Sequence, residues 1–241
     1  MGDETSRVAA FIAQQPTTSD QADGVVGILQ RLCGAAVGAL SASGAGMSVI
    51  AADGVRGITA ASDPASERIE ELQFVLGEGP CVDAFATRRP VLVPDLADGA
   101  MSRWPVYAPA VYVDGVRAVF AFPLQVGAAL LGVLDVFRAK PGSLTGAELR
   151  SALTFADVAV TTLLDGQDGA EPGRAAHGID EAVMSRSELY QAQGMVMVQL
   201  GVTLAEALAR MRAHAFAENR HLDQVAADII ARRLRFDRDQ P

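Results

Sequence analysis

The segment DGQDGAEPGRAAHG, residues 165–178, constrains the fold of this chain more than any other feature. It contains four glycines and one proline and has no apolar periodicity, which is the composition of a linker. The sequence before it mixes strand and helix patterns, whereas the sequence after it contains helical patterns alone. In a chain of 241 residues this predicts two domains, at 20–165 and 180–236, joined by a linker at 166–179.

The N-terminal part is predicted to form an α+β fold, an antiparallel sheet with helices packed on it. An Asp-Gly pair at 53–54 predicts a hairpin turn, and Asp63 before Pro64 predicts the start of a helix. The stretch from Thr145 to Glu148 is a capping box that starts another helix. The expected strands are 47–51, 55–60, 91–93, 117–124 and 129–137. The expected helices are 21–40, 64–76 and 146–164.

The C-terminal part is predicted to be an all-α bundle of three helices, at about 180–200, from a capping box at Thr203 to Glu206 and from about 222. The first helix carries two apolar seams. One seam, suited to packing inside the bundle, consists of Leu189, Ala192, Val196 and Leu200. The second seam consists of Tyr190, Gly194 and Met197. A bundle of under ~60 residues buries only a modest core, so the second seam needs a partner: another copy of the chain, the N-terminal domain or a ligand. Because the helices at 21–40 and 146–164 add further apolar surface, we predict a homodimer whose interface includes the second seam.

The charge of the chain is spread unevenly. Residues 1–184 carry 12 basic and 22 acidic side chains, whereas residues 185–241 carry 8 and 7. Only the C-terminal part is therefore suited to a polyanionic partner. The most apolar stretch, 118–134, is interrupted by polar residues, proline and glycine, so no membrane helix is expected.

Cysteine and histidine are scarce, which limits metal and cofactor chemistry. Cys33 and Cys81 are too few and too far apart in sequence to suggest a disulfide framework or a zinc site, so we expect a reduced, cytoplasmic protein without a metal. The histidines, His177, His214 and His221, lie beyond the N-terminal domain, which leaves it none to ligate haem or act as a base. The chain also has no G-x-x-x-x-G-K-[ST] phosphate loop. We expect no cofactor and no enzyme activity.

A set of spaced residues in the C-terminal part carries a family resemblance. The set is Arg186, Ala192, Gly194, Met197, Gly201, Val202, Thr203, Ala207, Arg212, Ala215, Asn219, Leu222 and Ala226. With these residues, the region 181–236 resembles the ANTAR domain, the small RNA-binding module of bacterial transcription antiterminators. Many family members have lysine where this chain has Gln193. Glutamine can donate hydrogen bonds there but gives no Coulomb attraction to phosphate.

Two stretches of the N-terminal part carry a second resemblance. They are LGEGPCVDAFATRRPVLVPDL (76–96) and LLGVLDVF (130–137), and they resemble parts of a GAF domain. A GAF domain followed by an ANTAR domain is a familiar arrangement in actinobacterial regulators. The resemblance implies a GAF-like sensor that binds an unidentified small molecule and controls an ANTAR three-helix output. That output would bind a nascent RNA stem-loop, so that a terminator hairpin does not form and transcription continues.

A nearly neutral C-terminal part has to bind RNA through a few selected side chains. Arginine can pair with phosphate through a bidentate fork or stack on an unpaired base, and asparagine can bind a base edge. The predicted RNA-binding residues include two positions of the first C-terminal helix, Gln193 and Gly194. The full set is Arg186, Gln193, Gly194, Arg212, Asn219 and Arg220. The arginines of 231–236 fit either a solvated helix end or phosphate contacts.

Two other functions compete with this interpretation. A DNA-binding transcription factor would use the second and third C-terminal helices as a helix-turn-helix, but its recognition helix would begin with apolar Leu222 and acidic Asp223. A redox enzyme on a GAF scaffold would use Cys81, for which a buried structural role is favoured because only distant Cys33 could be its partner. The glycines of GEGPCV (77–82) follow a helix pattern, which favours a tight turn over a phosphate loop.

Overall fold

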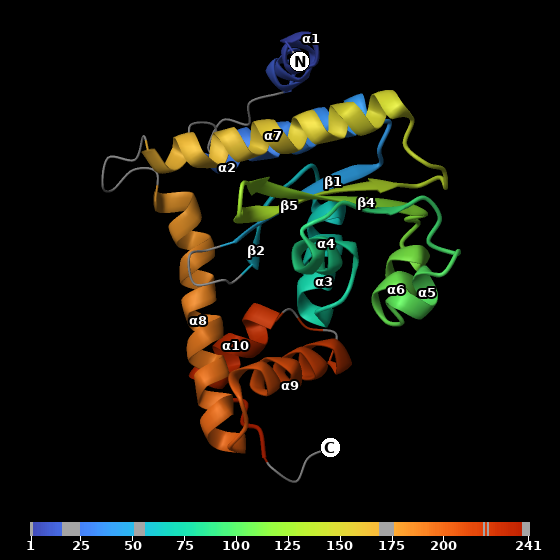
Figure 1. Cartoon of the computed structure of the whole chain (residues 1–241). Coiled ribbons are helices and arrows are strands. Elements are labelled where there is room, and N and C mark those ends of the chain that lie inside the picture. The colour runs from blue at the N-terminus through green and yellow to red at the C-terminus, as the bar shows by residue number, and fades with distance from the viewer. Residues whose placement is uncertain are drawn as a thin grey trace. The chain divides into compact units, whose positions relative to one another are not determined.

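The computed structural model of the chain describes residues 2–15, 25–50, 56–168, 176–218, 220 and 222–237. The chain divides into two compact units, Met1–Ile179 and Asp180–Pro241 (Figure 1). The turn predicted at 53–54 and residues 169–175 of the predicted linker lie outside the described residues.

A five-stranded antiparallel sheet forms the centre of the N-terminal unit, as the sequence predicts. Its strand order is β2-β1-β5-β4-β3. The strands are β1 (Gly44–Ile50), β2 (Arg56–Ala61), β3 (Val91–Val93), β4 (Ala118–Val126) and β5 (Ala129–Arg138). Strands β4 and β5, which lie close to the strands expected at 117–124 and 129–137, form an antiparallel hairpin.

Helices cover both faces of this sheet (Figure 1). On one face lie α2 (Val25–Ala39) and α7 (Gly146–Asp168), with α1 (Gly2–Ala13) packed against them. On the other face lie α3 (Pro64–Leu76), α4 (Pro80–Thr87), α5 (Ala100–Arg103) and α6 (Tyr107–Val113). Because successive residues of a strand point to opposite faces, β4 places Phe120 in the first of these layers and Val119 in the second.

The junction between α3 and α4 follows the turn chemistry of the sequence. Asp63 caps α3, because its carboxylate accepts hydrogen bonds from the backbone N–H groups of Ala65 and Ser66, both at 2.9 Å. Gly77 ends α3 with a φ of 68°, and Gly79, with a φ of 132°, precedes α4. The predicted turn is therefore the connection between two helices. The sequence does not predict α4, α5 and α6, because such short helices show no clear period.

The C-terminal unit is all-α. Its helices are α8 (Ala176–Leu200), α9 (Leu204–Ala217) and α10 (Leu222–Ile230). The capping box predicted at the start of α9 is present, since Thr203 and Glu206 each bond the backbone N–H of the other. The first seam of α8 is buried in the core of the bundle, as predicted. Among the described residues, no helix has both the length and the apolar character needed to cross a membrane.

Candidate functional site

A carboxylate lies in the centre of the sheet of the N-terminal unit. Asp135 on β5 is fully buried and lies between Val133 and Phe137, on the face that α3, α4, α5 and α6 cover. Its cross-strand partner on β1 is Gly46. A carboxylate in an apolar layer is costly unless hydrogen bonds, protons or a cation compensate for its charge. The residues around Asp135 therefore decide how its charge is compensated.

Small residues on β1 admit a second carboxylate beside Asp135. On this face β1 presents Gly44, Gly46 and Ser48, so α3 can lie close to the strand. A Cβ on Gly46 would lie only 2.4 Å from Cγ of Glu70, so the missing side chain makes room for the glutamate. The Glu70 side chain is 1 % exposed, and its Oε2 accepts a hydrogen bond from the Ser48 hydroxyl at 2.9 Å.

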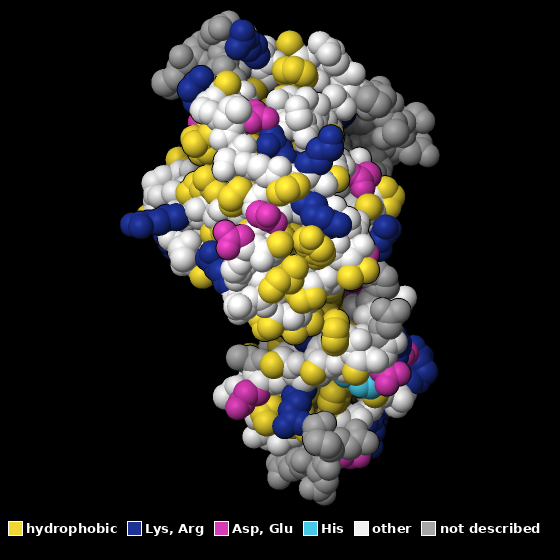
Figure 2. All heavy atoms as spheres, turned by 90° about the vertical axis from the view of Figure 1, so that its right-hand side faces the viewer, with side chains coloured by type: hydrophobic (Ala, Val, Ile, Leu, Met, Phe, Trp, Pro, Cys, Tyr) yellow, Lys and Arg dark blue, Asp and Glu magenta, His cyan; other side chains and the backbone are white. Residues whose placement is uncertain are grey.

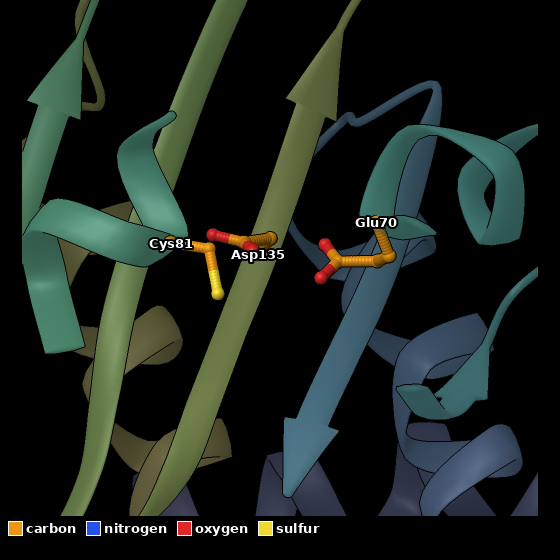
Figure 3. Close-up of side chains that lie close together, drawn as sticks. All are labelled: Glu70, Cys81 and Asp135. Atoms are coloured by element: carbon orange, nitrogen blue, oxygen red, sulfur yellow. The ribbon is translucent and has the colours of Figure 1, made fainter. Parts of the chain in front are cut away.

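Cys81, in the first turn of α4, completes this group, and Gln73 of α3 links it to Asp135. The Gln73 side-chain oxygen accepts from the Cys81 backbone N–H at 2.8 Å, while its Nε2 donates to Asp135 Oδ2 at 3.1 Å. One ligand atom from each of Glu70, Cys81 and Asp135 lies within 4.8 Å of the other two. Figure 3 shows Asp135 on its strand between Cys81 and Glu70. We call these three residues the carboxylate–thiol cluster.

The surroundings of the cluster contain uncharged donors. Burial raises the pKa of the Tyr107 phenol, and the charges of Asp135, Glu70 and Cys81 raise it further. The Tyr107 hydroxyl and the indole N–H of Trp104 are both buried and have no hydrogen-bond partner among the described residues. The cluster can therefore hold protons or a cation.

The second cysteine lies on the opposite side of the sheet. Cys33 of α2 belongs to the core layer under α2 and α7, whereas Cys81 belongs to the layer under α3 and α4. Both are free and buried, and burial raises the pKa of the Cys33 thiol. Because the sheet separates the two thiols, they cannot form a disulfide without a large rearrangement.

In the C-terminal unit, two arginines converge on one carboxylate. Arg220, just before α10, and Arg233, just after it, both form ion pairs with Asp228 of α10. Hydrogen bonds from Arg220 and Arg233 lower the pKa of Asp228. Asp228 therefore holds two guanidinium groups close together. The sequence identifies Arg220 as a candidate, but not its pairing with Asp228 and Arg233.

The other predicted RNA-binding residues occupy different environments. Arg212 lies half-buried on α9. Gln193 is 7 % exposed, and its amide donates to the Leu204 carbonyl at 2.7 Å. This bond positions the start of α9 and leaves the glutamine side chain little surface for an RNA contact. The Arg186 side chain and the whole of Asn219 lie outside the described residues.

The second seam of α8 is partly exposed. Tyr190, Gly194 and Met197 are half-buried, and neighbouring Val198 is 73 % exposed. A Cβ added to Gly194 would meet no atom within 4 Å. The seam therefore presents apolar surface with open space at its central glycine.

Two domain families match different parts of the chain. The GAF domain family matches residues 22–163, which is more than half of the chain. The chain belongs to the GAF domain family. The ANTAR domain family matches residues 178–230, so an ANTAR domain follows the GAF domain, as the sequence predicts. Among curated proteins, none matches this chain.

Solved structures of GAF domains resemble the first unit. One, from an Acinetobacter phosphoenolpyruvate-protein phosphotransferase, is 12 % identical with a TM-score of 0.51, covering 69 % of this chain and 94 % of that chain. Another, from the corresponding phosphotransferase of Coxiella burnetii, is 14 % identical with a TM-score of 0.52, again covering 69 % and 94 %. At these identities the similarity shows the GAF fold alone.

The spacing of the cysteine and histidine residues predicts no metal site in this chain. It does not detect the carboxylate–thiol cluster of the GAF domain, because two of the three cluster residues are carboxylates. Two other sequence signals point to it. Asp135 interrupts the apolar strand LLGVLDVF. Ser66, Glu70 and Gln73 recur at helical spacing and give α3 a polar face, which is buried. A buried polar face on a helix next to a charged strand residue is therefore the pattern to search for.

Proposed function

We propose that this chain is a cytoplasmic RNA-binding regulator, in which the GAF domain controls an ANTAR domain that binds a nascent RNA stem-loop. Binding would prevent a terminator hairpin from forming, so that transcription continues. The proposal rests on one observation, the match of a GAF domain at 22–163 followed by an ANTAR domain at 178–230. The GAF domain is a sensor domain and the ANTAR domain is a regulatory domain. The chain could therefore receive a signal in the first domain and respond through the second.

Control of the output requires two states of the GAF domain. A signal shifts their populations only if it binds one state more tightly than the other. The buried polar network of the GAF domain links α3 to β1 through the hydrogen bond between Ser48 and Glu70, and to α4 and β5 through Gln73. A ligand bound there would therefore act on four elements at once. We propose this network as the place where the GAF domain receives its signal.

The two alternatives have less support. A redox enzyme that used both cysteines would need them close together, but Cys33 and Cys81 lie in different core layers. A DNA-binding helix-turn-helix would insert the start of α10 into the major groove. There Leu222 is buried, and Asp223 is exposed and would face the phosphates.

RNA binding is testable by titration of the full chain. RNA crosslinked to the protein in its host would be sequenced, and the enriched stem-loop would be made as RNA and as DNA of the same sequence. On the face shown in Figure 2, Lys and Arg side chains lie scattered among apolar, neutral and acidic ones. With three or four phosphate contacts, we expect a slope of log affinity against log salt of about −2 to −3. Equal affinity for the RNA and the DNA would contradict the proposal.

The second seam of α8 is our proposed homodimer interface. Met197→Glu should convert the dimer to a monomer in light scattering at micromolar concentration, because an unpaired carboxylate would be buried there. We expect association to weaken by at least about 100-fold. Gln191→Glu, which adds the same charge at an exposed position of α8, is the control and should remain dimeric. A wild-type monomer, or a dimer that Met197→Glu leaves intact, would disprove the interface.

A further inference from the structure

We propose that the carboxylate–thiol cluster binds a divalent transition-metal ion, such as Zn²⁺ or Fe²⁺, inside the GAF domain. Glu70, Cys81 and Asp135 offer one sulfur and two oxygen ligands, all from buried side chains. A thiolate selects against Mg²⁺ and Ca²⁺, which prefer ligand sets made only of oxygen. Zinc sites that bind a further small ligand have this arrangement, with three protein ligands and an open fourth position.

The distances suit a site that closes around the ion. In a tetrahedral zinc site, bond lengths of about 2.3 Å to sulfur and 2.0–2.2 Å to oxygen place the ligand atoms roughly 3.4–3.6 Å apart. In the GAF domain the corresponding atoms lie within 4.8 Å of one another. Movements of about 1 Å would bring them into place, and rotation of the side chains can supply such movements.

The charge of the cluster favours a cation. Two carboxylates share this buried site, and the hydrogen bonds that reach them from Ser48 and Gln73 come from neutral groups. Buried charges of one sign need a counter-charge or bound protons. A divalent ion would replace the protons and offset two of the three negative charges carried by the two carboxylates and a Cys81 thiolate.

A buried donor in the core layer of the cluster gives independent support. The Tyr107 hydroxyl has no partner within the described ranges of the chain, although Tyr107 is 0 % exposed. Buried polar groups of native proteins nearly always have a partner, so such groups indicate an acceptor that completes the site. The Tyr107 hydroxyl belongs to the same core layer as Cys81 and as Val133 and Phe137, which flank Asp135 on β5. A metal-bound carboxylate or water would accept from it.

The metal site is independent of RNA binding and goes beyond it. Its ligands come from α3, α4 and β5, three elements of the GAF domain alone. A bound ion would draw α3 and α4 toward the sheet, which makes the ion, or a small molecule at its fourth position, a suitable signal for a sensor. RNA binding by the ANTAR domain can be present or absent without any effect on this assignment.

Cobalt is the probe for this site, because Co²⁺ takes the same ligands as Zn²⁺ and reports a bound thiolate by charge-transfer absorption. The full chain would be stripped with a chelator and titrated with Co²⁺, and then with Zn²⁺ and Mg²⁺. We expect one cobalt per chain, a thiolate-to-cobalt band that Zn²⁺ abolishes, and no displacement by Mg²⁺. Cys81→Ser should lose the band. Glu70→Gln and Asp135→Asn, which keep the side-chain shape, should each weaken binding by at least about 10–100-fold.

Cys33→Ser is the matched control, because Cys33 is a buried cysteine on the opposite side of the same sheet. It should keep the band and the affinity of the wild type. Fluorescence of the single tryptophan, Trp104, shows whether each variant is folded. A wild-type protein without a thiolate band, or a folded Cys81→Ser variant that keeps the wild-type spectrum, would overturn the metal site. Either result would leave the RNA-binding proposal unaffected.

Discussion

Gly46→Ala should lower the free energy of unfolding of the GAF domain by roughly 2–5 kcal/mol. The new Cβ would lie 2.4 Å from Cγ of Glu70 and 2.8 Å from its Oε1. Overpacking of this kind costs about 1–3 kcal/mol. The clash also pushes Glu70 away from Ser48, so their buried hydrogen bond is lost at a further cost of about 1–3 kcal/mol. The melting temperature should fall by roughly 5–15 °C.

The measurement uses the fluorescence of Trp104, the single tryptophan of the chain, which lies in the core of the GAF domain. Gly38→Ala is the matched control, because a Cβ on this glycine of α2 would meet no atom within 4 Å. The control should gain about 0.5–1 kcal/mol from the helix propensity of alanine. The double variant Gly46→Ala/Glu70→Ala should lose less than the sum of the single losses, because the colliding side chain is gone. Equal behaviour of Gly46→Ala and Gly38→Ala would disprove the close approach of Glu70.

The sheet and the long helices of the GAF domain are predictable because their signals are local. The apolar run of β5 and the capping residues Asp63 and Thr145 each act within a few residues of their own position. The cluster is different, because Glu70, Cys81 and Asp135 meet only after α3 and α4 fold back onto β5. Residues 70 and 135 are far apart in the chain, and no local pattern connects them. The fold is therefore predictable here from local signals, whereas the grouping of these three residues is not.

The same contrast holds in the ANTAR domain. The capping box of α9 and the buried first seam of α8 follow from spacing within one helix, and the structure confirms both. The role of Gln193 depends on a contact with Leu204, which belongs to the next helix. The pairing of Arg220 and Arg233 depends on Asp228, which lies between them in the sequence and joins the two ends of α10. Side-chain roles that depend on a second element cannot be predicted from one helical pattern.

The double variant Arg212→Ala/Arg220→Ala should lower the affinity of the full chain for its RNA stem-loop by at least about 30-fold. Each arginine that contacts a base contributes roughly 1–3 kcal/mol, and contributions from separated residues add. Arg150→Ala, which removes the same charge from an exposed position of the GAF domain, is the control and should leave the affinity unchanged. Titrations at several salt concentrations measure both variants. An unchanged affinity in the double variant would contradict the role of these arginines.

Lysine substitutions then distinguish the kind of contact. Arg220→Lys keeps the positive charge but loses the planar fork that binds phosphate or a base edge through two parallel hydrogen bonds. If Arg220 acts as a fork, Arg220→Lys should lose nearly as much affinity as Arg220→Ala. If it acts only as a charge, lysine should restore most of the affinity, and the salt slope should return to that of the wild type. Because Asp228 already holds the Arg220 and Arg233 guanidinium groups close together, we expect the fork, and a full rescue by lysine would argue against it.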